Sequence, residues 1–226
     1  MTSAGPSERK WTAVFDVCDT LFSANTTLDF LRFHAQRSGD VKLNRALERW
    51  TARSSPAFYA GALALRLLHR DIGRTRIIAA LHGSPRDELE RAARDYVRES
   101  LSARSVQPVH ERLRQHLARG DRVILASSSL DLVIAPVAKS LGVETWVASE
   151  LGFRDGRCTG RLVHDLTGRK SQAIAGILEA SEAIHVYTDN RSDRDLLVLA
   201  DRRTVILPSG SRRGRWAGKD CEYVAT

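Results

Sequence analysis

Apolar and polar positions follow two different periods along the chain. Short apolar runs, rich in β-branched residues, are separated by longer stretches in which apolar residues recur every three or four positions. The short runs predict five strands, at residues 11–17, 122–126, 145–147, 183–188 and 204–207. Strands that alternate with helices are typical of an α/β fold, because parallel strands need a crossover that is usually a helix. We therefore predict a doubly wound parallel sheet with helices on both faces.

The interval between the first two predicted strands, residues 18–121, is far longer than one crossover helix requires. Within it, apolar residues recur at helical spacing in two groups, Leu28, Leu31 and Ala35, then Phe58, Ala62, Leu65 and Leu68. We predict a small helical domain at residues 23–105, inserted into a core domain made of residues 11–22 and 106–210. A hairpin is expected at residues 151–163, around Asp155 and Gly156. Residues 1–10 and 211–226 are predicted to be flexible tails.

Composition places the chain among ordinary globular proteins. Its 226 residues suffice for one α/β domain and a smaller insertion, with 42% hydrophobic and 27% charged residues. The net charge of +8 is compatible with nucleic acid, an anionic membrane surface or an anionic small substrate. No nucleic-acid-binding motif occurs, so we expect no nucleic-acid partner. Most arginines are typical of solvated helix faces, and a dense cluster occurs only at Arg212, Arg213 and Arg215.

Three cysteines without paired spacing argue against a disulfide framework and against a four-ligand zinc site. A reducing compartment therefore fits best. No stretch approaches the roughly 20 apolar residues that a membrane span needs, and residues 1–10 are polar. We expect a cytoplasmic protein without a membrane span, and the sequence does not indicate its oligomeric state.

The first predicted strand runs directly into Asp16, Cys18 and Asp19. Ligands bind at the carboxyl ends of parallel strands, and a carboxylate there can serve as a nucleophile that splits one difficult hydrolysis into two steps. The plainer alternative is a strand followed by a polar turn.

Three further segments carry candidate chemistry. Ser127 and Ser128 follow the second strand, where hydroxyls and helix amides can seat an anion, or where a serine can simply cap a helix. Lys170 opens a helix, where a cation opposes the helix dipole and needs an anionic partner or solvent. Asp189 and Asp193 follow the fourth strand. Their carboxylates suit Mg²⁺, which prefers oxygen ligands. The alternative is that Asp189 is a loop acid and Asp193 an acid at a helix N-terminus, stabilised by the helix dipole.

In their order and spacing, these four segments resemble the four motifs of the haloacid dehalogenase superfamily, over residues 14–207. The long helical insertion after the first motif is similar to the C1 cap of the phosphoserine-phosphatase-like branch. The resemblance implies a Rossmann-like sheet of order 3-2-1-4-5 with the active site beneath the cap. It also implies site roles: Asp16 as nucleophile; Asp16, Asp189, Asp193 and the backbone carbonyl of Cys18 on Mg²⁺; Ser127, Ser128, Lys170 and Asn190 on the phosphate.

The sequence departs from this pattern at Cys18. Phosphatases of the family carry Asp-x-Asp there, with the second aspartate as acid and base, and the next position, here Asp19, is usually glycine. A thiol beside carboxylates is a poor base, and Cys18 is also explained as a small residue in a tight turn. General acid–base catalysis contributes about 10² to 10⁴-fold, so we expect slow or selective hydrolysis, with Asp19 as a possible substitute.

The predicted function is Mg²⁺-dependent hydrolysis of a small phosphorylated metabolite through an aspartyl-phosphate. A phosphotransferase with the same intermediate stays open, as does a non-catalytic member that binds a phosphorylated ligand or a protein. Dehalogenation is disfavoured because Asp189 and Asp193 keep the metal pattern. Substrate choice is expected to lie in the insertion, where Asn25, Arg32, His34 and Arg37 either contact the substrate or form a solvated helix face.

Overall fold

The computed structural model describes residues 11–68, 71–178, 183–190, 193–207 and 221–225. The predicted N-terminal tail, the arginine cluster at Arg212, Arg213 and Arg215, and the motif residues 191–192 lie outside the described residues. The five predicted strands all lie within them.

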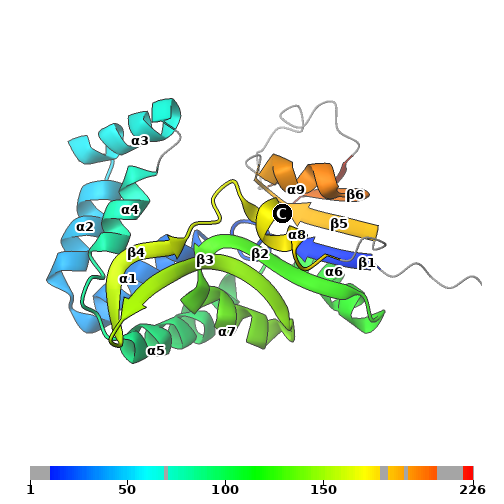
Figure 1. The fold of residues 1–226 in the computed structure, drawn as a ribbon, viewed down its shortest axis with the longest axis horizontal. Helices are drawn as coiled ribbons and strands as arrows, with labels where there is room; N and C mark the ends of the chain where they lie inside the picture. Colours follow the sequence, from blue (N-terminus) through cyan, green and yellow to red (C-terminus); the bar gives the residue numbers. More distant parts are fainter. Residues whose placement is uncertain (1–10, 69–70, 179–182, 191–192, 208–220, 226) are drawn as a thin grey trace, which may run out of the picture.

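The described residues form one seven-stranded sheet of order β4-β3-β2-β1-β5-β6-β7 (Figure 1). The strands are β1 (Trp11–Phe15), β2 (Arg122–Leu130), β3 (Thr145–Arg154), β4 (Arg157–His164), β5 (Ala183–Thr188), β6 (Arg202–Leu207) and β7 (Glu222–Ala225). All neighbouring strands pair in parallel except β3 and β4, which are antiparallel. The five strands predicted from the sequence are β1, β2, β3, β5 and β6, and their predicted order 3-2-1-4-5 is confirmed.

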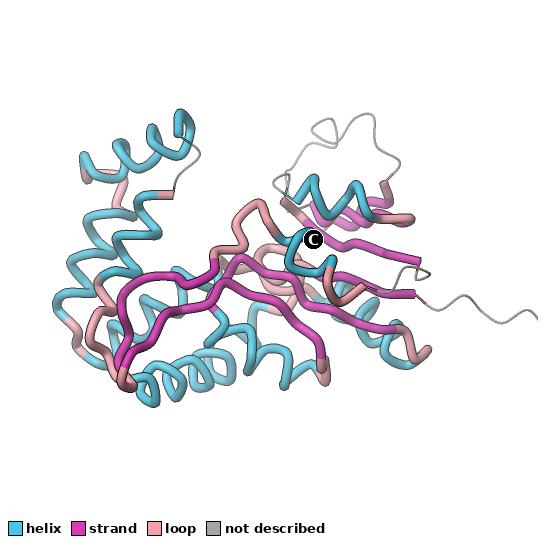
Figure 2. The backbone as a smooth tube through the Cα atoms, in the orientation of Figure 1, coloured by secondary structure: helices cyan, strands magenta, loops and turns pink. Residues whose placement is uncertain are grey.

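Alternating side chains of the central strands enter two separate hydrophobic clusters, one on each face of the sheet. Phe15, Leu125 and Tyr187 belong to the first cluster, and their neighbours Val14 and Ile124 belong to the second. The first face is covered by α6 (Gln107–Ala118) and α7 (Asp131–Leu141), and the second by α8 (Lys170–Ala175) and α9 (Arg194–Leu199). Figure 2 shows helices above and below the strands, as the doubly wound prediction requires.

The segment between β1 and β2 is helical, as predicted. It consists of α1 (Thr26–Ser38), α2 (Val41–Thr51), α3 (Pro56–Leu68), α4 (Ile72–Ala79), α5 (Arg86–Tyr96), the π-helix η1 (Val97–Leu101) and the 3₁₀-helix η2 (Ser102–Arg104). We call α1–α5 the inserted helices. Asn25, Asp40 and Asp71 cap the N-termini of α1, α2 and α4, each accepting a backbone N–H at 2.8–3.1 Å. Gly39, with φ of +66°, ends α1.

The β3–β4 hairpin is longer than the predicted residues 151–163 and reaches the inserted helices (Figure 1). Its turn is at Asp155 and Gly156 as predicted, both with positive φ. Beyond the sheet, the Gly83 N–H donates to the Cys158 carbonyl at 2.8 Å, and the Cys158 N–H donates to the Ser84 carbonyl at 2.9 Å. The hairpin thereby connects the sheet to the loop between α4 and α5.

The predicted C-terminal tail also differs from the structure. Residues 222–225 form β7, which continues the parallel sheet beside β6. Val224 is buried, and the Glu222 carboxylate pairs with Arg112 of α6. These contacts join residues distant in sequence, which the local composition of a polar C-terminus does not reveal.

Buried polar side chains of β5 and its neighbours form a continuous chain of hydrogen bonds. Asp121 Oδ2 lies 2.7 Å from His116 Nδ1, and His116 Nε2 lies 2.9 Å from the Tyr187 hydroxyl. That hydroxyl lies 3.2 Å from His185 Nδ1, and His185 Nε2 lies 2.8 Å from Thr204 Oγ1. Each ring nitrogen therefore has a partner, which offsets the cost of burying polar atoms in the core.

Candidate active site

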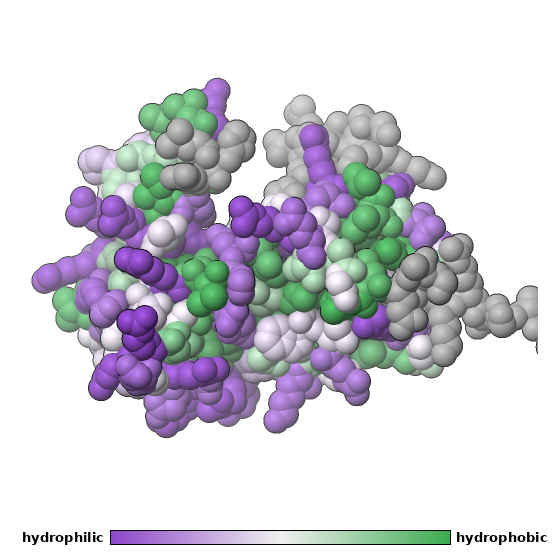
Figure 3. Space-filling model, viewed as in Figure 1, coloured by the Kyte–Doolittle hydropathy of each residue, from purple (hydrophilic) through white to green (hydrophobic). Residues whose placement is uncertain are grey.

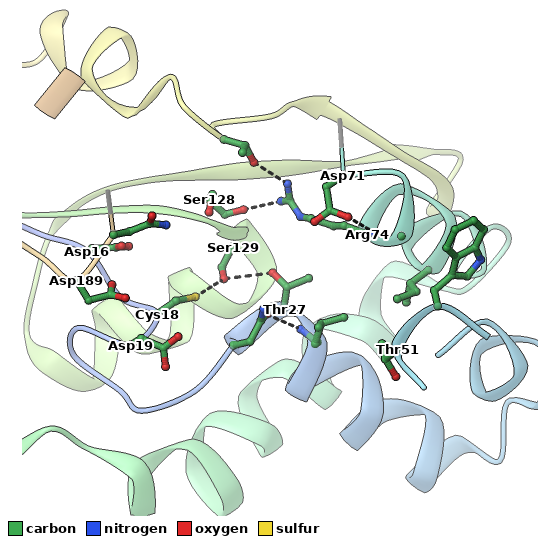
Figure 4. Close-up of a pocket in the computed structure, with 17 residues that line it drawn as sticks. Asp16, Cys18, Asp19, Thr27, Thr51, Asp71, Arg74, Ser128, Ser129 and Asp189 are labelled. Atoms are coloured by element: carbon green, nitrogen blue, oxygen red, sulfur yellow. Dashed lines mark hydrogen bonds between the residues drawn. The ribbon is translucent and has the colours of Figure 1, made fainter. Parts of the chain in front are cut away.

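A pocket of about 300 Å³ lies where the carboxyl ends of β1, β2 and β5 meet the inserted helices (Figure 4). At one end it is lined by four groups from the loops after β1 and β5, namely Asp16, Cys18, Asp19 and Asp189. At the other end it is lined by apolar side chains of the inserted helices, namely Leu28, Trp50 and Ile77. One end is thus acidic, whereas the other combines these apolar side chains with polar and charged ones, among them Asp71 and Arg74.

Asp16 and Lys170 form a buried ion pair at the acidic end. Lys170 Nζ lies 2.8 Å from Asp16 Oδ1 and 2.8 Å from Asp193 Oδ2. Asp16 is 3% exposed, Lys170 2% and Asp193 1%. Asp16 comes from the end of β1, Lys170 from the first residue of α8 and Asp193 from the residue before α9, so the parallel sheet brings together groups that are distant in sequence.

The electrostatic balance of this cluster is negative. Burial raises the pKa of Asp16 to about 7, although the Lys170 ammonium lowers it. Burial by itself lowers the pKa of Lys170, but the charges of Asp16 and Asp193 raise that pKa above its usual range. Burial also raises the pKa of Asp189 to about 6, although a hydrogen bond from Thr20 Oγ1 at 3.0 Å lowers it. One ammonium faces more carboxylates than it can neutralise.

These acids do not form a complete cage of protein ligands. Among the described residues, no group of three His, Cys, Asp or Glu side chains is arranged to hold a metal ion. Asp193 Oδ2 instead accepts hydrogen bonds from Lys170 and from Thr188 Oγ1, both at 2.8 Å. Asp16 and Asp189 line the pocket, and Asp193 lies behind Lys170. This donor set still fits Mg²⁺, which commonly takes one or two carboxylates and completes its octahedron with waters and substrate oxygens.

Cys18 faces a cluster of hydroxyls. Its Sγ lies 3.1 Å from Thr26 Oγ1 and 3.2 Å from Ser129 Oγ. Burial, and next the charge of Asp16, raise the pKa of the Cys18 thiol, so the group is a neutral thiol at neutral pH. The same loop holds Asp19 at φ of +51°, in the left-handed region that favours glycine. Asp19 is exposed at the pocket edge, and burial followed by the charge of Asp29 raises its pKa.

The serines lie within β2 rather than at the start of a helix. β2 continues to Leu130 through an irregular register between Ala126 and Leu130, and α7 begins at Asp131. The interpretation of this segment as a helix N-cap is therefore wrong. Ser127 is fully buried, and its Oγ accepts the Ser129 N–H at 3.2 Å, whereas Ser128 and Ser129 line the pocket. The assignment of Ser127 and Ser128 to the phosphate stays a prediction.

Asn190 also lines the pocket, beside Asp189. Its N–H donates to Thr188 Oγ1 at 3.0 Å, the same hydroxyl that donates to Asp193. The loop after β5 is therefore held by two buried threonines, Thr188 and Thr20, which keep Asp189 and Asn190 beside Asp16.

Sequence reasoning did not single out Arg74, which reaches from α4 to the sheet. Its Nη1 donates to Asp165 Oδ1 and to Thr167 Oγ1, both at 2.9 Å, and its Nη2 donates to the Ser128 carbonyl at 2.5 Å. Its side chain is 15% exposed and lines the pocket, as Figure 4 shows. One arginine among several in a helical segment gives no local sign that it connects α4 with the sheet.

Of the four polar residues expected to face the substrate from the insertion, Asn25 lines the pocket. Arg32 and Arg37 are exposed and pair with Asp29 and Glu99, and His34 is buried 4.0 Å from Glu88. The alternative of a solvated helix face therefore holds for the two arginines.

Comparison with known proteins agrees with this geometry. The family model for haloacid dehalogenase-like hydrolases matches residues 13–197. The chain belongs to this family. Solved structures similar to it include a protein of unknown function from Bordetella pertussis Tohama I, with a TM-score of 0.67 and 21% identity over 96% of this chain and 98% of that one. A substrate-bound phosphoserine phosphatase has a TM-score of 0.60 and 16% identity over 96% of this chain and 94% of that one.

The fold of this chain is thus similar to that of phosphoserine phosphatases, in agreement with the predicted resemblance, and the family model confirms the haloacid dehalogenase-like hydrolases. Among curated proteins, the chain is 26% identical over 93 residues to the protein CicA of Caulobacter vibrioides. That match spans 38% of this chain and 40% of the relative's length.

Proposed function

We propose that this protein is a Mg²⁺-dependent hydrolase of small phosphomonoesters that acts through an aspartyl-phosphate on Asp16. The observation that carries the proposal is the buried Asp16 carboxylate, which opens onto the pocket while Lys170 holds its Oδ1 at 2.8 Å. A carboxylate so placed is a nucleophile beside a fixed cation. Phosphoryl transfer depends mainly on such positioning and on stabilising the charge of the transferring group.

Asp16 is oriented by its own contacts. Oδ1 accepts from Lys170 and from the Val17 N–H at 2.7 Å, so we assign the attack on phosphorus to Oδ2. The attack forms an acyl phosphate and expels the alkoxide of the ester, which takes up a proton. Water then attacks the phosphorus of the intermediate, loses a proton, and releases inorganic phosphate with the regenerated carboxylate.

Asp16, Asp189 and the backbone carbonyl of Cys18 are the groups that would hold Mg²⁺ in this pocket. When bound, the ion supplies positive charge that neutralises the phosphate oxygens and the surplus acids. Asp193, predicted as a further ligand, has a different role in this proposal: it fixes Lys170 from behind, together with the Thr188 hydroxyl that anchors the loop.

Proton transfer is the weak step of this site. The thiol of Cys18 neither donates a proton readily nor accepts one, because burial and Asp16 raise its pKa. Asp19 lies on the same loop and lines the pocket, and because its pKa is raised it keeps a proton to give at a higher pH than an ordinary exposed aspartate does. We assign the residual acid–base role to Asp19.

The shape of the pocket indicates the class of ester. Its volume of about 300 Å³ suits a small metabolite, with the phosphate at the acidic end and the alcohol portion against Leu28, Trp50 and Ile77. Arg74 closes this end by joining α4 to the Ser128 carbonyl. A partly apolar alcohol that also carries polar groups therefore fits this end.

A phosphotransferase is the second candidate, and Cys18 favours it. A site without a strong base activates water poorly, so an acceptor alcohol bound in the pocket competes with water for the intermediate. Both candidates share the first half of the reaction and differ in what attacks the acyl phosphate.

The test is an assay of phosphate release from a panel of phosphomonoesters, with Mg²⁺ or with chelator, for wild type and Asp16→Asn. Asp155→Asn, at the exposed hairpin turn, is the matched control. The proposal expects release that requires Mg²⁺, survives Asp155→Asn and is lost in Asp16→Asn. Transfer to added glycerol in excess of hydrolysis would favour the phosphotransferase, and release that Asp16→Asn retains would contradict both.

A further inference from the structure

Helix α3 turns its large apolar side chains outward. Tyr59, Leu63 and Leu67, spaced four residues apart, are 61%, 56% and 64% exposed, and Leu65, on the other side of the helix, is also 50% exposed. On another side of the helix Phe58 is half-buried, and a side chain at Gly61 would meet the Trp50 ring at 3.6 Å. A helix that only completed a core would bury its large apolar side chains. Figure 3 shows this apolar surface over α3 at the upper left.

The helices around α3 carry a surplus of positive charge. Residues 41–79 contain eight lysines and arginines and two acids, a surplus of six against a net charge of +8 for the whole protein. Arg53, just before α3, and Arg66, in its last turn, are both exposed. An apolar helix face is thus bordered by cations.

We propose that α3 docks this protein onto an anionic lipid surface. An apolar helix face with basic residues at its edge binds in the plane of the membrane interface, where the side chains enter the headgroup region and the cations meet anionic lipids. No helix among the described residues is long and apolar enough to cross a membrane, so the contact is peripheral.

A second copy of the chain fits this surface less well. A stable protein interface buries about 800 Å² on each partner. The 13 residues of α3 span only about 20 Å, and the exposed stripe covers one face of that length. Two copies meeting through α3 would also bring their surplus positive charges together.

Docking through α3 brings the pocket close to the lipid surface. Trp50 lies between the two, since a side chain at Gly61 of α3 would meet its ring and Trp50 also lines the pocket. Figure 1 draws α9 on the same side of the molecule as α3, and its Val198 is 77% exposed. Exposed apolar side chains therefore lie on both sides of the pocket, on α3 and on α9.

The test is vesicle sedimentation of the full chain with phosphatidylcholine, and with phosphatidylcholine containing phosphatidylglycerol. The variant is Leu63→Gln combined with Leu67→Gln, and the matched control is Val41→Gln, a 59% exposed valine at the far end of α2. We expect binding to the anionic vesicles only, weakened about tenfold per leucine replaced and unchanged in Val41→Gln. Arg66→Gln should weaken it about fivefold.

Three results would overturn the proposal: no binding to anionic vesicles, equal binding to neutral vesicles, or binding that the double leucine variant retains. A concentration-dependent dimer that this variant abolishes would assign α3 to a second copy instead. Phosphate release from a soluble ester is measured on the same samples. A loss of vesicle binding can then be told apart from a loss of the proposed hydrolase activity. The replaced side chains are exposed, so the variants are expected to fold.

Discussion

Restoring a carboxylate at position 18 should accelerate phosphate release. In Cys18→Asp the new carboxylate replaces a thiol that lies 3.1 Å from Thr26 Oγ1 and 3.2 Å from Ser129 Oγ. Both hydroxyls can donate to a carboxylate, which favours its ionised form. The residue would therefore serve well as the base that activates water and less well as the acid that protonates the leaving alcohol.

The expected size of the gain follows from this asymmetry. General acid–base catalysis contributes about 10² to 10⁴-fold, and a carboxylate whose proton is held weakly should reach the lower end, about 10²-fold. That factor corresponds to a barrier lower by about 3 kcal/mol. A further negative charge beside Asp16 should at the same time lower the free energy of unfolding when Mg²⁺ is removed.

The assay compares kcat for wild type, Cys18→Asp and Cys18→Asn with a generic phosphate ester at saturating Mg²⁺. Cys18→Asn has nearly the size of the aspartate but cannot exchange a proton, so it should match wild type within a few-fold. Equal acceleration by asparagine would show that shape rather than proton transfer limits the site. A folded Cys18→Asp without acceleration would refute the assignment of proton transfer as the weak step.

Three other predictions concern the neighbouring groups. Lys170→Met leaves two buried carboxylates without their cation, so the free energy of unfolding at neutral pH should fall by about 3–5 kcal/mol in urea titrations, with Mg²⁺ restoring part of it. Arg74→Lys keeps the charge but cannot bridge three acceptors, so KM should rise more than kcat falls in steady-state kinetics; a pure kcat effect would contradict a pocket-closing role. Burial, and next the His116 charge, lower the pKa of His185 to about 3 from its usual 6.5; the folded state then binds fewer protons, and stability present above pH 6.5 is lost as the pH falls. Between pH 7 and pH 5 this loss is about 2 kcal/mol, and His185→Gln should flatten that slope in denaturation curves, whereas the exposed His164→Gln should not.

The sheet was predictable because each of its central strands is a short apolar run, and three of them end in the polar residues of a site. Parallel pairing then dictates that Asp16 and Asp189 meet at one edge, which requires no knowledge of side-chain contacts. The position of Lys170 at the start of a helix left its partner open between an anion and solvent, and only the resemblance brought it into the site; in the structure it pairs with Asp16.

What escaped the sequence depends on contacts between distant segments. β2 continues past Ala126 because Leu130 pairs with Ser149 of β3, and a local pattern of hydroxyls is equally compatible with a helix cap. The reach of Arg74 to the Ser128 carbonyl depends on where α4 lies against β2. The periodicity of α3 predicted a helix correctly, but periodicity alone does not say that Leu65 is exposed.

A covalent phosphoryl bond to Asp16 is the central feature of the proposed reaction, and it can be trapped directly. Protein incubated with a phosphomonoester and Mg²⁺ is quenched in acid, reduced with borohydride, which converts an aspartyl-phosphate to homoserine, and digested for mass spectrometry. The account predicts homoserine at position 16 in wild type and in Cys18→Asn, and none in Asp16→Asn or with chelator. Phosphate release without any modification at position 16 would contradict it.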